Sequence, residues 1–173
     1  FTAFFTECFV DELARIAGAE PLAYRIGLLS GNVRLAQALT TAAAIGGWDG
    51  GGPGSSMGLA CLSAFGSHIG LLASASVTPD QRIKGDRIVA AVDCGRIVNS
   101  NLVRQQIEGG LIAGLSQATQ PLPEFRYGMA VAGPPRGPRL AGTPSIEVEL
   151  IRSNADPGGV NGLGFAAVAP AVA

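Results

Sequence analysis

The chain has 173 residues, of which 47% are hydrophobic, and a formal net charge of −1 at pH 7. This length fits one domain or part of a larger protein, and the apolar content predicts a folded core. The balanced charge lacks the basic stripe typical of nucleic-acid-binding proteins, and no apolar run reaches the roughly 18 residues of a membrane span. The chain begins at Phe1 without an initiator methionine and ends on Val172-Ala173, which favours a segment of a longer polypeptide.

The first part of the chain predicts three helices. Residues 6–17 carry apolar side chains at helical spacing, with Glu7 and other charged side chains on the opposite side. Glu20-Pro21 opens a second, short helix. Asn32 is placed to cap a third, alanine-rich helix that runs to about residue 45. The three cysteines, Cys8, Cys61 and Cys94, are too far apart for a zinc site or a disulfide framework, so we expect buried free thiols.

Two segments are predicted as connections. The glycine-rich stretch at 49–56 follows the helices, and Trp48 is expected to pack at its edge. It is not followed by Gly-Lys-Ser/Thr, so it is not a Walker-type phosphate loop. The proline-rich stretch at 119–145 is predicted to be extended and irregular.

Four apolar segments predict strands. Residues 57–65 form an apolar run of strand length, and residues 69–77 alternate in a way that predicts a strand with one buried face. Residues 88–92 are expected to return as its antiparallel partner. Residues 146–150 alternate again, with two glutamates on the solvent side. Helices in a run followed by clustered strands indicate an α+β fold.

A helix over about 102–118, capped by Asn99 or Ser100, contains Gly109, Gly110 and Gly114. Each glycine costs a helix about 1 kcal/mol relative to alanine. Such a helix indicates that something approaches it closely. Another helix and a cofactor are both consistent with the pattern.

The segment from Pro157 to Phe165 is rich in glycine and leads into an apolar stretch in which Pro170 is placed as the first residue of a helix. A glycine-rich loop before a helix N-terminus is a common binding site, although a flexible surface turn has the same composition. Residues 162–167 also match G-x-G-x-x-A, the fingerprint of a dinucleotide-binding oxidoreductase. That alternative lacks the preceding strand and the later acidic residue.

Five motifs, in this order, resemble those of the molybdenum hydroxylases. The best match is the molybdopterin-binding large subunit of the isoquinoline 1-oxidoreductase type, in the xanthine dehydrogenase/aldehyde oxidase family. The motifs are F-F-T-E-C-F-V-D-E-L-A (4–14) with E-P-L-A-Y-R (20–25), A-F-G-S (64–67), V-D-C-G-R-I-V-N (92–99), Q-I-E-G-G-L-I-A-G-L (106–115), and P-G-G-V (157–160) with V-A-P-A (168–171). The resemblance implies the C-terminal segment of such a subunit, with a partial cofactor-binding domain built on a mixed sheet with packed helices. Residues 1–48 would be helical, 49–56 a connector, and 57–173 a C-terminally truncated molybdopterin-binding segment.

The resemblance also implies a site. In the family, the glutamine of the Q-x-E-G-G helix contacts the pterin, and its glycines let the cofactor approach. The turn at 93–99 is expected to support that helix. The implied cofactor contacts are Gln106, Gly109 and Gly110 on the helix, Gly158 and Gly159 in the terminal loop, and Phe65 and Gly66 near the active-site cavity.

The family motif P-G-G-V-x-E ends in the catalytic glutamate, a general base, and Gly162 occupies that position here. Two hypotheses follow. The chain is part of a hydroxylase that uses water to oxidise an N-heterocycle or an aldehyde, or it is part of a degenerate, non-catalytic cofactor-binding subunit. In either case the resemblance implies molybdenum-molybdopterin cytosine dinucleotide and a small [2Fe-2S] partner subunit that takes the electrons. The compartment stays open between cytoplasm and periplasm.

Overall fold

The computed structural model describes residues 2–119, 125–131 and 143–173. Much of the predicted proline-rich connection therefore lies outside the described residues. The elements are α1 (Thr2–Ile16), α2 (Pro21–Leu28), α3 (Val33–Gly46), β1 (Met57–Ala64), β2 (Ser67–Val77), β3 (Ile83–Asp93), α4 (Ser100–Thr119), β4 (Phe125–Arg126), β5 (Met129–Ala130), β6 (Ser145–Leu150) and α5 (Leu163–Ala171). Among the described helices, none has the length and apolar character needed to cross a bilayer.

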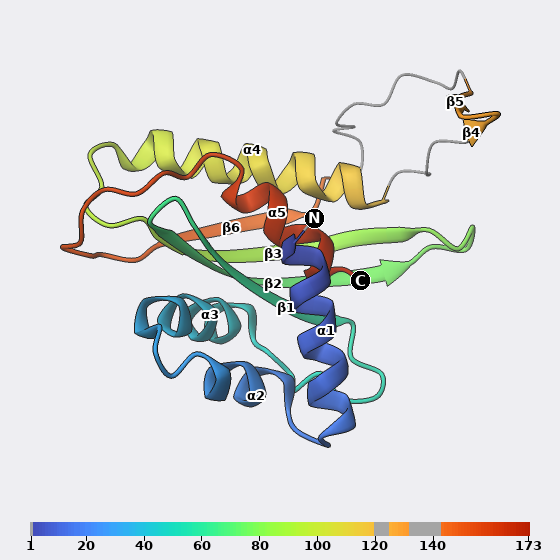
Figure 1. The fold of residues 1–173 in the computed structure, drawn as a ribbon, viewed down its shortest axis with the longest axis horizontal. Coiled ribbons are helices and arrows are strands. Elements are labelled where there is room, and N and C mark those ends of the chain that lie inside the picture. Colours follow the sequence, from blue (N-terminus) through green and yellow to red (C-terminus); the bar gives the residue numbers. More distant parts are fainter. Residues whose placement is uncertain (1, 120–124, 132–142) are drawn as a thin grey trace.

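The core is a four-stranded sheet in the order β1-β2-β3-β6 (Figure 1). The first three strands are antiparallel, as predicted for β2 and β3, and β6 lies parallel to β3. The parallel strand makes the sheet mixed, so the predicted α+β fold class is confirmed. In β6 the predicted alternation is also confirmed, with Val148 buried and Glu147 and Glu149 exposed.

Helices cover both faces of the sheet (Figure 1). On β2, Ile69 and Leu71 belong to the buried cluster that contains residues of α4 and α5, whereas Leu72 belongs to the cluster that contains residues of α3. The prediction of one buried face was therefore wrong for the first half of this strand. The physical reason is Gly70, because a side chain there would collide with the backbone of Ala38 on α3. A strand without a side chain at this point lets an alanine-rich helix approach the second face.

The orientation of α1 differs from the prediction. Glu7, expected on the solvent side, is only 8% exposed, whereas Phe9 is 59% exposed. Glu7 faces inward because its carboxylate accepts hydrogen bonds from the Cys61 backbone N–H at 2.8 Å and from Arg25 Nε at 3.4 Å. The Arg25 guanidinium is itself buried and also bonds Asp11 at 2.6 Å. Paired and hydrogen-bonded, these charges can leave water.

The predicted helix starts are mostly confirmed by their caps. Asn32 Oδ1 accepts from the Leu35 N–H at 3.2 Å, and Asn99 Oδ1 accepts from the Leu102 N–H at 3.1 Å. The prediction for Pro170 was wrong, since α5 begins at Leu163 and Pro170 lies in its last turn. The helix starts early because Gly162 adopts a left-handed conformation, with φ of +73°, and ends the loop there.

The cysteines follow the prediction in part. Cys61 and Cys94 are buried free thiols, whereas Cys8 on α1 is only half-buried. Burial raises the pKa of Cys61 to about 12. A thiol with this pKa stays protonated at neutral pH and acts as a small core residue.

Candidate functional site

The three glycines of α4 have different surroundings. An added Cβ at Gly114 would lie 2.5 Å from the Phe165 carbonyl oxygen, and one at Gly110 would lie 3.2 Å from the Phe165 backbone nitrogen. These two glycines therefore let α5 cross α4 closely, which is the helix alternative predicted from the sequence. Gly109 is exposed, and a Cβ there would meet no described atom within 4 Å. Only Gly109 leaves bare backbone open beside the site.

The terminal glycine loop is anchored on two turns at the end of the sheet. The Gly158 N–H donates to the Cys94 carbonyl at 2.9 Å, and the Gly159 N–H donates to the Phe65 carbonyl at 2.8 Å. A side chain at Gly158 would collide with the hydroxyl of Ser67. The double glycine is needed for this close approach, and the structure brings together Phe65, Gly66, Gly158 and Gly159.

The turn after β3 is held by an ion pair that the sequence did not indicate. Asp93 is 2% exposed and accepts from the Arg34 guanidinium of α3 at 2.6 and 2.7 Å and from the Gly95 N–H at 3.0 Å. The hydrogen bond from Arg34 holds the pKa of Asp93 below its ordinary value. The carboxylate thus stays ionised and fixes the turn on which the glycine loop is anchored.

His68 lies opposite Asp93 in the strand register. Its Nδ1 atom is 2.6 Å from Ser63 Oγ, which also accepts from Asn32 Nδ2 at 3.3 Å. Burial and the charge of Arg34 lower the pKa of His68. The ring is therefore neutral near pH 7. Its tautomer decides whether Nδ1 donates or accepts the hydrogen bond with Ser63 Oγ.

Ser67, the last residue of the A-F-G-S motif, has an environment that the sequence did not indicate. Its side chain is fully buried, and its hydroxyl has no hydrogen-bond partner among the described residues. Buried polar atoms are nearly always satisfied, so an unpartnered one is informative. This hydroxyl lies directly beneath Gly158 of the terminal loop.

Gln106 and the end of the terminal loop meet across the chain. Gln106 Nε2 on α4 donates to Asn161 Oδ1 at 3.4 Å, and both side chains are exposed. The next residue, Gly162, has no side-chain cap and no described atom within 4 Å of an added Cβ. Asn161 follows Gly159 by two residues, so its backbone lies at most about 7 Å from the anchored part of the loop. Gln106 and Gly162 thus lie beside one exposed polar contact at the start of α5, and Gly109 is exposed three residues along α4 from Gln106.

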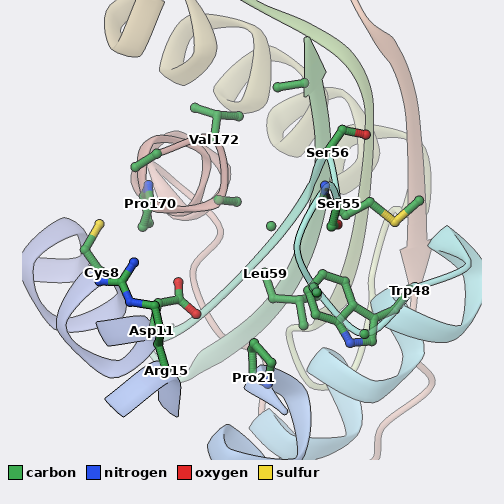
Figure 2. A pocket seen from close by; sticks show the side chains of 18 of the residues that line it. Cys8, Asp11, Arg15, Pro21, Trp48, Ser55, Ser56, Leu59, Pro170 and Val172 are labelled. Atoms are coloured by element: carbon green, nitrogen blue, oxygen red, sulfur yellow. Dashed lines mark hydrogen bonds between the residues drawn. The ribbon is translucent and has the colours of Figure 1, made fainter. Parts of the chain in front are cut away.

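A separate cavity of about 870 Å³ lies at the opposite end of α5. Figure 2 shows Cys8, Asp11 and Arg15 of α1 on one side of it and Trp48 and Ser55 on the other. None of the site residues predicted from the sequence lines this cavity. The helix separates it from Gly162 by roughly 13 Å, given 1.5 Å per residue. In the described part of the chain, no three His, Cys, Asp or Glu side chains cluster as metal ligands would.

Comparisons with known proteins agree with the motifs. A family model described as a molybdopterin cofactor-binding domain matches residues 65–127. Isoquinoline 1-oxidoreductase subunit beta from Brevundimonas diminuta is 29% identical over 98% of this chain and 23% of that protein. The chain therefore spans about a quarter of the length of this relative.

Solved structures share the fold. Quinoline 2-oxidoreductase from Pseudomonas putida 86 aligns with a TM-score of 0.51 and 23% identity, over 61% of this chain and 15% of that chain. Reconstituted CO dehydrogenase from Oligotropha carboxidovorans aligns with a TM-score of 0.53 and 18% identity, over 61% and 14%. Together with the five motifs and the mixed sheet, these matches confirm the resemblance predicted from the sequence: the chain is similar to the molybdopterin-binding large subunits of the molybdenum hydroxylase family, of the isoquinoline 1-oxidoreductase type.

Proposed function

We propose that this chain provides part of the molybdopterin-binding site of a molybdenum hydroxylase that oxidises an N-heterocycle or an aldehyde. The observation that carries the proposal is the exposed contact between Gln106 of α4 and Asn161 at the end of the glycine loop. Gln106 and Asn161 lie 55 positions apart in the sequence. Both side chains are exposed, so their contact does not belong to the buried core.

The residues present fit a pterin-bearing group. An exposed amide such as that of Gln106 both donates and accepts, as the edge of a pterin requires. Gly109 and Gly162 expose backbone with free space above it, so a flat ring can approach closely. The exposed ring of Phe65, which stands beside Gly159, adds an apolar wall.

The roles of the cofactor and of the protein residues follow from this fit. When bound, the molybdenum cofactor, proposed in its cytosine dinucleotide form, would supply the two-electron oxidation, and a small [2Fe-2S] subunit would accept the electrons. Gln106 orients the pterin, and the loop at 157–162 approaches it with unhindered backbone. The ion pair between Arg34 and Asp93 holds the turn on which that loop is anchored.

The residue that is missing is a base. Gly162 has no side chain to accept a proton, and Asp156, six residues upstream, lies on the far side of the double glycine. A general base typically contributes about 10²- to 10⁴-fold in rate. This observation favours a second candidate function, in which the subunit holds the cofactor but turns over slowly or not at all.

The deciding experiment compares Gly162→Glu with Gly162→Gln in protein produced with a supply of molybdenum cofactor. Both side chains enter free space, and both cost about 1–2 kcal/mol because φ at this position is positive. Only the glutamate can act as a base. We expect dye reduction with an N-heterocycle to rise in Gly162→Glu alone. Protein that contains neither molybdenum nor pterin after cofactor supply would refute both candidate functions.

A further inference from the structure

The dipeptide Asn161-Gly162 has the chemistry of a self-modifying site. Backbone nitrogen after an asparagine can attack the asparagine side-chain carbonyl carbon when nothing shields it. Here the following residue is glycine, and among the described residues its N–H has no hydrogen-bond acceptor. An added Cβ at Gly162 would meet no described atom within 4 Å, and Asn161 is exposed. The nucleophile and its target are therefore both accessible.

Gln106 adds an activating contact. Its Nε2 donates to Asn161 Oδ1 at 3.4 Å, which is the oxygen that gains negative charge when the side-chain carbonyl is attacked. A hydrogen-bond donor at a developing oxyanion lowers the barrier of acyl transfer. The same contact holds the Asn161 side chain beside the loop backbone.

We propose that Asn161 deamidates in the folded protein and that the product places a carboxylate one residue before the position of the family's base. The Gly162 nitrogen gives up its proton and forms a bond to Asn161 Cγ, the bond from Cγ to Nδ2 breaks, and Nδ2 takes up a proton and leaves as ammonia. Water then opens the five-membered imide at either carbonyl. The product is aspartate or isoaspartate at position 161. No oxidant or further reactant is needed.

The consequence for catalysis rests on the proposed function. A carboxylate at position 161 supplies the type of group that Gly162 lacks, and it lies beside Gln106. The loop is bare of side chains at positions 158, 159 and 162, so little stands between this carboxylate and a bound group. Deamidation converts an inert loop into one that carries a base.

The modification is tested by peptide mapping with mass spectrometry after incubation at mildly alkaline pH in ¹⁸O-labelled water. Asn154, which is exposed in the same loop but followed by alanine, is the internal control. We expect conversion at Asn161 well ahead of Asn154, and suppression in Gly162→Ala. Gln106→Leu should slow it about threefold to tenfold, the value of one net hydrogen bond. Equal conversion at both asparagines, or unchanged conversion in Gly162→Ala, would overturn the proposal.

The catalytic consequence has its own test. In cofactor-loaded protein, Asn161→Asp should reduce dye faster than Asn161→Ala, by up to about 100-fold. Equal rates would refute the catalytic role and leave the modification standing. Failure of the proposed function is distinguishable from failure of either claim about Asn161. If the proposed function is wrong, the unmodified protein contains no molybdenum and no pterin. Deamidation is measured without the cofactor and does not depend on that result.

Discussion

The glycines of α4 allow one substitution to be placed at two positions with opposite expected effects. Gly109→Ala adds a Cβ that meets no described atom within 4 Å. The alanine should stabilise the helix by about 1 kcal/mol, because glycine loses more backbone entropy on folding. For a chain of this length, such a gain raises Tm by about 2–4 °C.

Gly114→Ala meets a different environment. Its Cβ would lie 2.5 Å from the Phe165 carbonyl oxygen, whereas ordinary contacts begin at 3.4 Å, so α5 would have to retreat by 3.4 − 2.5 = 0.9 Å. Overpacking of this kind costs about 1–3 kcal/mol and outweighs the helix-propensity gain. We therefore expect Gly109→Ala to melt above the unmodified protein and Gly114→Ala to melt below it.

The same pair of variants tests the site. Gly109 is the one of the three glycines that α5 does not cover, and the proposed function assigns it to the cofactor, so its alanine variant should hold less pterin although its fold is more stable. Thermal unfolding of the cofactor-free protein gives the first effect, and pterin and molybdenum content after cofactor supply gives the second. Equal Tm shifts in the two variants would refute the packing argument. Undiminished pterin in Gly109→Ala would refute the assignment of this glycine to the cofactor.

Three further outcomes are expected. Ser67→Ala should raise the free energy of unfolding of the cofactor-free protein by about 1 kcal/mol in urea titrations, because it removes a buried hydroxyl without a partner; a loss of similar size would indicate a bond that the hydroxyl makes. His68 is the single histidine, and burial lowers its pKa, so stability from it is present above pH 6.5 and is lost as pH falls through the folded pKa. NMR titration should give a folded pKa below that of the unfolded chain, and a higher one would contradict the argument. Arg25→Met should cost about 3–5 kcal/mol, since Glu7 then stays buried without its cation. Burial already raises the pKa of Glu7, so the loss should be smaller at mildly acidic than at mildly alkaline pH, and a pH-independent loss would count against it.

Local patterns predicted the parts of the fold that depend on neighbouring residues. The caps at Asn32 and Asn99 and the alternation of β6 each rest on groups within a few positions. The inward orientation of Glu7 could not be predicted in this way. Its partners, Arg25 and Cys61, lie 18 and 54 residues away, and only the assembled fold brings them to the same carboxylate.

The same limit applies to the candidate site. The resemblance named Gln106 and the terminal glycines, but the contact between Gln106 and Asn161 joins residues 55 positions apart. The ion pair between Arg34 and Asp93 spans 59 positions. Ser67 stands in the motif A-F-G-S, but the sequence did not indicate that its hydroxyl is buried without a partner among the described residues.

The buried charges of α1 have a consequence for how the molecule assembles. Among the described residues of α1, Glu7 is the most deeply buried ionisable group. Its carboxylate is stabilised by Arg25 of α2 and by the backbone of β1, so α1 cannot pack favourably on its own. Docking therefore becomes cooperative: α2 and β1 must be in place before the charge of Glu7 can leave water at acceptable cost. α1 should thus be the last helix to gain protection in hydrogen exchange and the first to lose it.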